Sequence, residues 1–110
     1  MDERARRIGE NEAVYRAVNE KIQTLNESFG TLAESMTIVC ECGNLSCAEQ
    51  IRVDPGTYER VRSDPTQFVV VPGHELEDVE QVVEENDAYA IVRKRPGTPE
   101  QVARETDPRG

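Results

Sequence analysis

The chain has 110 residues, enough for one domain, and carries 22 acidic against 13 basic side chains, a net charge of −9. This charge argues against non-specific binding to nucleic acid or to an anionic membrane surface. Only 36% of the residues are hydrophobic and Trp is absent, so the core is thin, which favours a metal, a partner or both. No apolar run approaches the roughly 20 residues of a membrane span, and the charged start lacks the apolar stretch of a secretory signal. We therefore expect a cytoplasmic protein that binds neither nucleic acid nor membrane.

Residues 1–32 predict a long amphipathic helix, the first of three segments. Apolar side chains recur every seven residues in two interleaved series, which is the pattern of a helix that packs against another surface. This seam could cover its own domain, or it could pair with a second copy of the chain or with a larger partner. We expect Gly30 to end the helix. The seam consists of Ile8, Tyr15, Val18, Ile22, Leu25, Phe29 and Leu32, with Asn11 as its polar member.

Residues 33–95 predict a small metal-binding α+β domain. Two runs, 37–40 and 49–53, are β-branched or alternate in polarity, and they predict a hairpin whose tip carries the cysteines. Asp54 followed by Pro55 is typical of a helix N-cap and first helical position, so we expect a short helix directly after the hairpin.

The predicted fold class is α+β: a long N-terminal helix followed by a small zinc-stapled mixed β-sheet with two short helices. The second short helix is predicted over 75–87, which holds seven acidic residues and no basic one, because its apolar residues have helical spacing. The polar, proline-containing segment 96–110 is expected to be a flexible tail, on which Val102 could dock locally. The remaining predicted strands are 68–71, the best candidate for a buried strand, and 89–92.

Three cysteines, Cys40, Cys42 and Cys47, fall within eight residues, and the single histidine is His74. Residues two apart in a strand face the same side, so Cys40 and Cys42 present their sulfurs together. A turn at Gly43 can bring Cys47 back to them. Three thiolates need a cation to offset their charge, and they suit zinc or an iron–sulfur cluster. Because tetrahedral Zn²⁺ takes a fourth ligand, His74 completes the predicted Cys3His metal site.

Other interpretations of these residues stay open. His74 would be an exposed turn residue if Asp54, Glu49 or water completed the metal's coordination. Without a metal, the cysteines would be buried structural thiols or a redox pair, since an odd number of cysteines argues against a disulfide framework. No second histidine and no glycine-rich phosphate loop accompanies them, so we expect no enzymatic activity.

The runs C-E-C-G-N-L-S-C at 40–47 and P-G-H-E at 72–75 resemble motifs of a group of small actinobacterial-type proteins without an established activity. The similarity extends over nearly the whole chain, including the helical leader. It implies a shared fold and a C-x-C-x4-C plus P-G-H-E pattern consistent with a Cys3His site. The pattern differs from that of Cys3His [2Fe–2S] proteins of the CDGSH type, in which the histidine lies shortly after the last cysteine, whereas 26 residues separate Cys47 from His74 here.

The sequence therefore favours a non-enzymatic zinc-binding protein that acts through protein–protein interaction or dimerisation of its N-terminal helix. The alternative is an iron–sulfur or thiol redox sensor that uses the same cysteines. The helix residues expected to contact the partner are Ile8, Tyr15, Val18, Ile22 and Leu25.

Overall fold

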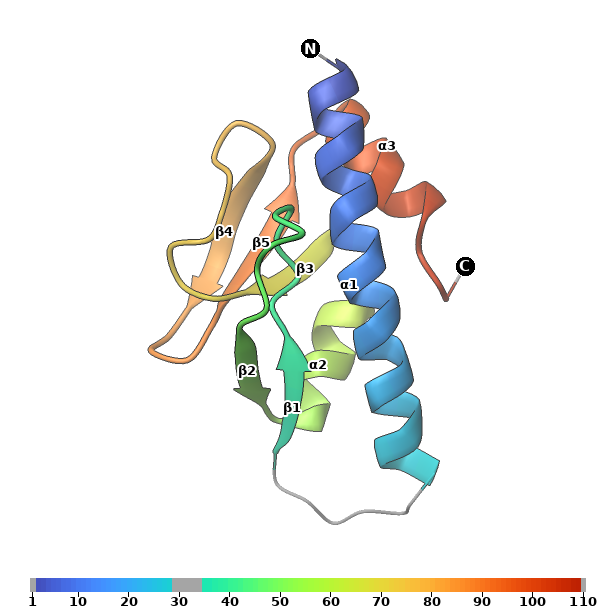
Figure 1. Cartoon of the computed structure of the whole chain (residues 1–110), viewed down its shortest axis with the longest axis vertical. Helices are drawn as coiled ribbons and strands as arrows, with labels where there is room; N and C mark the ends of the chain where they lie inside the picture. Colours follow the sequence, from blue (N-terminus) through green and yellow to red (C-terminus); the bar gives the residue numbers. More distant parts are fainter. Residues whose placement is uncertain (1, 29–34, 110) are drawn as a thin grey trace.

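The computed structural model describes residues 2–28 and 35–109, and it has an α+β fold (Figure 1). The expected end of the first helix, with Phe29, Gly30 and Leu32, lies outside these residues. No helix in the described part is long and apolar enough to cross a membrane. The elements are α1 (Asp2–Ser28), β1 (Met36–Val39), β2 (Gln50–Val53), α2 (Pro55–Arg62), β3 (Gln67–Val70), β4 (Glu80–Glu85), β5 (Ala90–Lys94) and α3 (Thr98–Glu105).

The strands form two small sheets, and every strand pair is antiparallel within the described residues. β1 and β2 form the predicted hairpin, and β3, β5 and β4 form a second sheet in that order. The single mixed sheet of the prediction is thus replaced by two antiparallel ones. Side chains from both sheets share one apolar core, which includes Ile38, Phe68 and Ile91, each at most 1% exposed.

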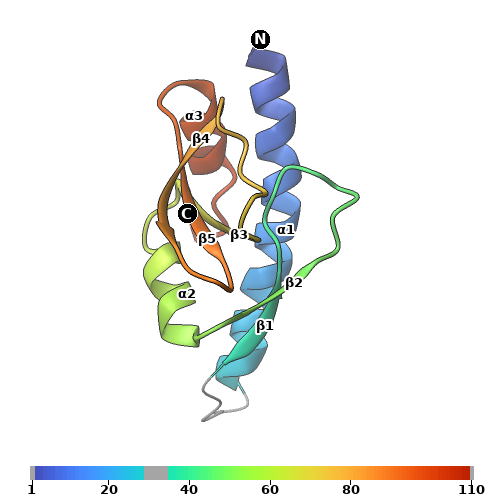
Figure 2. The same cartoon turned by 90° about the vertical axis from the view of Figure 1, so that its left-hand side faces the viewer.

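The long helix α1 runs along both sheets and along α3 (Figures 1 and 2). Its inner face is largely polar, which differs from the apolar seam that the heptad pattern predicts. Ile8 is buried and Ile22 packs against the core as expected, but Val18 and Leu25 are 43% and 57% exposed. The buried side chains of this helix are Ala5, Ile8, Glu12, Arg16, Asn19 and Gln23.

Polar side chains can occupy this face because each meets a complementary group in the interior. The Lys94 ammonium lies 2.6 Å from a Glu12 carboxylate oxygen and 2.9 Å from one of Glu80, and all three side chains are at most 1% exposed. Buried charges are tolerated only when they are paired in this way. The triad therefore joins α1 to the sheet through β4 and β5.

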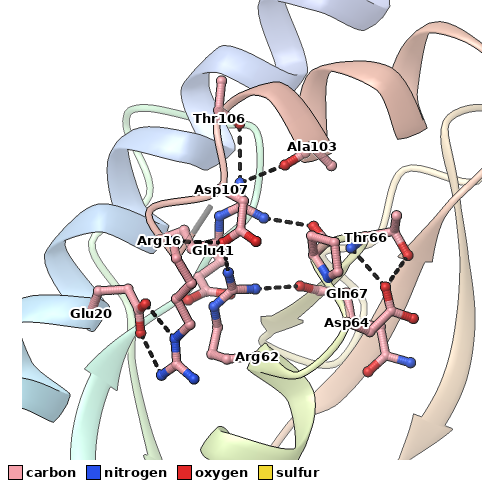
Figure 3. A network of polar contacts seen from close by, with 12 residues as sticks. Arg16, Glu20, Glu41, Arg62, Asp64, Thr66, Gln67, Ala103, Thr106 and Asp107 are labelled. Carbon is pink, nitrogen blue, oxygen red and sulfur yellow. Dashed lines mark hydrogen bonds and ion pairs between the residues drawn. The ribbon is translucent and has the colours of Figure 1, made fainter.

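A second polar network fastens the C-terminal segment to α1 and α2 (Figure 3). The Arg16 guanidinium lies over the Phe68 ring, 4.5 Å from its centroid, and donates to the backbone carbonyls of Pro65 and Ala103. Arg62 pairs with Asp107 at 2.6 Å. The segment 96–110, expected to be a flexible tail, therefore contains the helix α3 and packs against α1.

One apolar contact explains why α3 approaches α1 so closely. Val102 of α3 is fully buried, and a Cβ atom added at Gly9 of α1 would lie 2.6 Å from its Cγ1 atom. Only glycine fits at that position of α1.

The prediction of a helix over 75–87 is wrong. Residues 77–79 form a turn and β4 follows, pairing with β5 along its length with an irregularity between Val82 and Glu84. The helical spacing of Leu76 and Val79 has another cause. The turn at 77–79 brings both side chains to the same side, where they pack with Ala5 and Ile8 in a small apolar cluster. β4 is an edge strand of its sheet. Acidic side chains on such an edge prevent it from pairing with strands of other chains.

Burial raises the pKa of the Glu12 carboxyl well above its ordinary value, and the Lys94 ammonium offsets part of this effect. The folded protein therefore keeps a proton at Glu12 that the unfolded chain releases once the pH exceeds about 4.3. The protonated Glu12 carboxyl stabilises the folded protein most below that pH. This contribution is lost as the pH rises through the pKa of Glu12 in the folded state, which is the higher of the two. We expect Glu12→Gln, which mimics the protonated acid, to lose less unfolding free energy than the wild type as the pH rises above about 4.3.

Urea unfolding of the two proteins at equal metal loading measures this difference. The matched control is Glu27→Gln, which removes an exposed carboxylate from the same helix and accounts for the change in net charge. Equal pH slopes for Glu12→Gln and the wild type would show that Glu12 is not the titrating group.

Candidate metal centre

Three of the four predicted ligands come from the loop between β1 and β2. Cys40 and Cys42 are 1% and 3% exposed, and they lie on the same side of the extended chain, as the strand period requires. A turn then returns the chain: the Cys47 N–H donates to the Asn44 carbonyl at 2.9 Å, and the Ser46 N–H donates to the Asn44 side chain. Cys47 is thereby brought back to the other two sulfurs.

His74 reaches the cysteines from the end of β3. The His74 N–H donates to the Val71 carbonyl at 2.9 Å and closes a tight turn, in which Gly73 has a φ of 93°. A side chain at Gly73 would be strained, because positive φ values favour glycine. The same segment reaches a cysteine directly, since the Val71 N–H lies 3.2 Å from the Cys40 sulfur and donates to it.

The four predicted ligands meet at one point. Their donor atoms, from Cys40, Cys42, Cys47 and His74, all lie within 4.8 Å of one another. The Nδ1 atom of His74 is 3.6 Å from the Cys40 sulfur and 3.7 Å from the Cys47 sulfur. With metal–sulfur and metal–nitrogen bonds of about 2.3 and 2.0 Å, a tetrahedral ion requires sulfur–nitrogen separations of about 3.5 Å. The group could therefore hold a metal ion with little rearrangement.

The imidazole is oriented by a carboxylate on its outer side. The Nε2 atom of His74 lies 3.1 Å from a Glu49 oxygen, so a proton on Nε2 leaves the Nδ1 lone pair free to face the sulfurs. Ligating histidines in metalloproteins are commonly held by such a carboxylate, which fixes the tautomer and raises ligand basicity. Glu49 is thus in contact with the imidazole and does not replace His74 in the cluster.

Burial also changes the protonation of two of the cysteines. Burial raises the pKa of the Cys40 thiol, and the neighbouring Cys42 and Cys47 raise it further, whereas the N–H of Val71 opposes the change. Burial likewise raises the pKa of Cys42. Without a cation the thiols of Cys40 and Cys42 are held in their protonated form, so a divalent ion must displace these two protons as it binds.

Residues of α1 hold the cysteine loop in place. The Tyr15 hydroxyl lies 2.7 Å from the carbonyl oxygens of both Leu45 and Cys47, and the Asn11 amide donates to the Gly43 carbonyl at 3.0 Å. A Cβ atom at Gly43 would lie 2.7 Å from a methyl carbon of Ile8, so glycine permits the loop to lie directly on the helix.

Glu41 anchors the loop from the opposite side of the chain. Its side chain is fully buried and accepts hydrogen bonds from the Asn19 amide, the Tyr58 hydroxyl and the Val69 N–H. Burial raises the pKa of this carboxyl, and the three donors oppose the change. The backbone N–H of Glu41 also donates to the Val69 carbonyl, so the chain between Cys40 and Cys42 is fixed to β3.

The sequence identified the four clustered residues but not the residues that support them. Asp54, considered as a substitute ligand, instead accepts a hydrogen bond from the Thr57 N–H and is the N-cap of α2, as its position before Pro55 also predicted. Asn11 and Tyr15 belong to the predicted helix seam, but their contacts to the loop are long-range and leave no local signal. The polarity of Asn11 within an apolar seam was the one indication.

A small pocket of about 230 Å³ adjoins the cluster and is lined by Cys42, Asn44, His74 and Glu75, among others. The His74 side chain is 30% exposed, so an ion can reach the cluster from solvent by this side.

No family model, curated protein or solved structure matches the chain. The chemistry of the site therefore rests on its own residues.

We expect Glu49→Ala, which removes both the charge and the oxygen that faces His74, to lower the affinity for Zn²⁺ about tenfold, the usual effect of losing a carboxylate that orients a ligating histidine. Competition with a chromophoric chelator measures the affinity. The matched control is Glu75→Gln, which also removes one charge beside the cluster but keeps the oxygen that accepts from the Gly73 N–H. An equal loss in both variants would mean that Glu49 acts only through its charge.

Proposed function

We propose that the protein is a small, non-enzymatic zinc-binding protein with a structural Cys3His site, and that it acts through contacts with other protein chains. The observation that carries this proposal is the convergence of Cys40, Cys42, Cys47 and His74 within 4.8 Å. Soft thiolates with one imidazole are a common ligand set of structural zinc.

The spacing of the donor atoms favours one ion over an iron–sulfur cluster. In a two-iron cluster the ligands are divided between two metal atoms, so some donors are separated by the width of the cluster. All four donors here lie within 4.8 Å of one another, and the two sulfur–nitrogen distances of 3.6 and 3.7 Å match a single tetrahedral ion.

A closed shell of four protein ligands supports a structural role. Catalytic zinc keeps one coordination position for water or substrate, usually with three protein ligands. Four donors converge here, and three of them are thiolates that reduce the Lewis acidity of the ion. The Glu49 carboxylate lies against the imidazole, 3.1 Å from its Nε2 atom, and so orients a ligand.

The metal stabilises a fold whose interior contains many polar groups. Zinc binding at such sites contributes roughly 10–16 kcal/mol near neutral pH, and this energy is available to folding. The ion would join the β1–β2 loop to the segment after β3, two regions that also meet through the Val71 N–H and the Cys40 sulfur. All three cysteines lie in the described residues and form no disulfide, which is consistent with a cytoplasmic location.

We expect protein purified without a metal-binding tag to contain about one zinc per chain and to be colourless, because Zn²⁺ does not absorb visible light. Removal of the ion by a chelator should unfold the domain, since the apparent binding energy of roughly 10–16 kcal/mol exceeds the stability of most small domains. Elemental analysis, absorbance spectra and circular dichroism with and without chelator measure the three properties.

Cys42→Ser should lose the metal and the cooperative thermal transition. Ser46→Ala is the matched control in the same loop, because its side chain is exposed. A brown protein after anaerobic purification would support the iron–sulfur alternative. A metal-free protein that melts at an unchanged temperature would contradict both.

A further inference from the structure

The outer face of α1 carries an unpartnered apolar surface. Val14, Val18 and Leu25 are 54%, 43% and 57% exposed, and they account for three of the five large apolar side chains exposed to this degree in the described residues. Separations of four and seven residues place the three on one helix face. This face points away from the sheets, because the buried side chains of α1 lie on the opposite side.

Two unpaired charges lie on the same face, one on each side of the valines. Glu10 precedes Val14 by four residues, Lys21 follows Val18 by three, and both side chains are exposed. Among the described residues neither Glu10 nor Lys21 belongs to an ion pair, although most arginines of this protein do.

This face is complementary to itself. In a dimer with a two-fold axis, the same surface of both copies meets. If two α1 helices cross antiparallel with the axis between Val14 and Val18, then Val14 of one copy meets Val18 of the other. The same axis places Glu10 opposite Lys21 of the second copy, to within about one residue. A parallel arrangement would instead bring like charges together.

The ends of the face also match. Arg7 precedes Val14 by seven residues and Leu25 follows Val18 by seven, so the antiparallel pairing lays the aliphatic stem of Arg7 along Leu25. Arginine stems commonly cover apolar surface in this way. The acidic strand β4 is the edge of its sheet farthest from α1 (Figure 1), so the negative charge along this strand stays away from the contact.

We propose that the protein forms an antiparallel, two-fold symmetric dimer through this face of α1, with Val14 and Val18 at the centre and two Glu10–Lys21 ion pairs around them. The proposal specifies the partner in the proposed function, and it does not depend on the identity of the metal. One helix face is a small interface, so the dimer is weak and forms at high protein concentration, as is typical of interfaces below about 1,200 Å².

Charge reversal tests the pairing directly. Sedimentation equilibrium of the zinc-loaded full chain measures the dimer dissociation constant. Glu10→Lys or Lys21→Glu alone places two like-charged pairs at the interface, and each should weaken the dimer about tenfold. The double variant Glu10→Lys/Lys21→Glu restores opposite charges and should return the constant to within about twofold of the wild type.

The apolar centre is tested by Val18→Glu, which should abolish association up to the highest concentration measured. Val83→Glu is the matched control: Val83 is 40% exposed but lies on β4, so its substitution should leave the dimer unchanged. Zinc content and circular dichroism of every variant confirm that each is folded and loaded.

A wild-type chain that stays monomeric throughout would overturn the dimer, and so would a double variant that remains as weak as the single ones. A wild type that dimerises without binding zinc would leave this proposal standing and refute the zinc site. The two failures are therefore distinguishable.

Discussion

The buried carboxylate of Glu41 connects the cysteine loop between β1 and β2 to the interior of the fold. Side chains alternate along extended chain, so the residue between Cys40 and Cys42 points inward when both sulfurs point outward. Burying an ionisable group is costly unless its acceptors are used. Here both oxygens accept hydrogen bonds, from donors on α1, α2 and β3. The contacts that stabilise the core thereby also fix the backbone of two candidate ligands.

The polar interior has a consequence for the outer surface of α1. Polar residues, among them Glu12, Arg16 and Asn19, occupy the buried side of α1. Because a helix has only one side toward the core, apolar residues on the opposite side face solvent. Val14 and Val18 consequently face solvent. Burial of polar groups in ion pairs and side-chain hydrogen bonds contributes less stability than apolar packing of the same volume. A fold of this kind gains correspondingly more from an ion or from a second chain.

Local features of the sequence predicted the elements whose stability is local. The β1–β2 hairpin, the Asp54 cap of α2 and the grouping of three cysteines follow from short-range patterns, and the structure contains each. His74 lies 26 residues after Cys47 and was predicted because a tetrahedral ion takes a fourth ligand. The conformations of 75–87 and 96–110 depend instead on ion pairs between residues far apart in the sequence. Lys94 forms a buried ion pair with Glu80, the first residue of β4. Arg62 of α2 forms an ion pair with Asp107, in the segment after α3. Neither contact leaves a periodic signal, so 75–87 was predicted as a helix and 96–110 as a tail.

The helix α1 separates the candidate metal centre from the proposed dimer face, and one residue shows how the two sides are related. Tyr15 follows Val14 directly, yet its hydroxyl contacts the carbonyls of Leu45 and Cys47 in the loop. Consecutive residues of a helix point about 100° apart, so the loop is bound along one flank while the valines remain exposed. A metal that orders the loop therefore restrains the middle of α1, where Val14 and Val18 lie. Because rigid surfaces lose less entropy on association, the ion would favour dimerisation without contacting the partner.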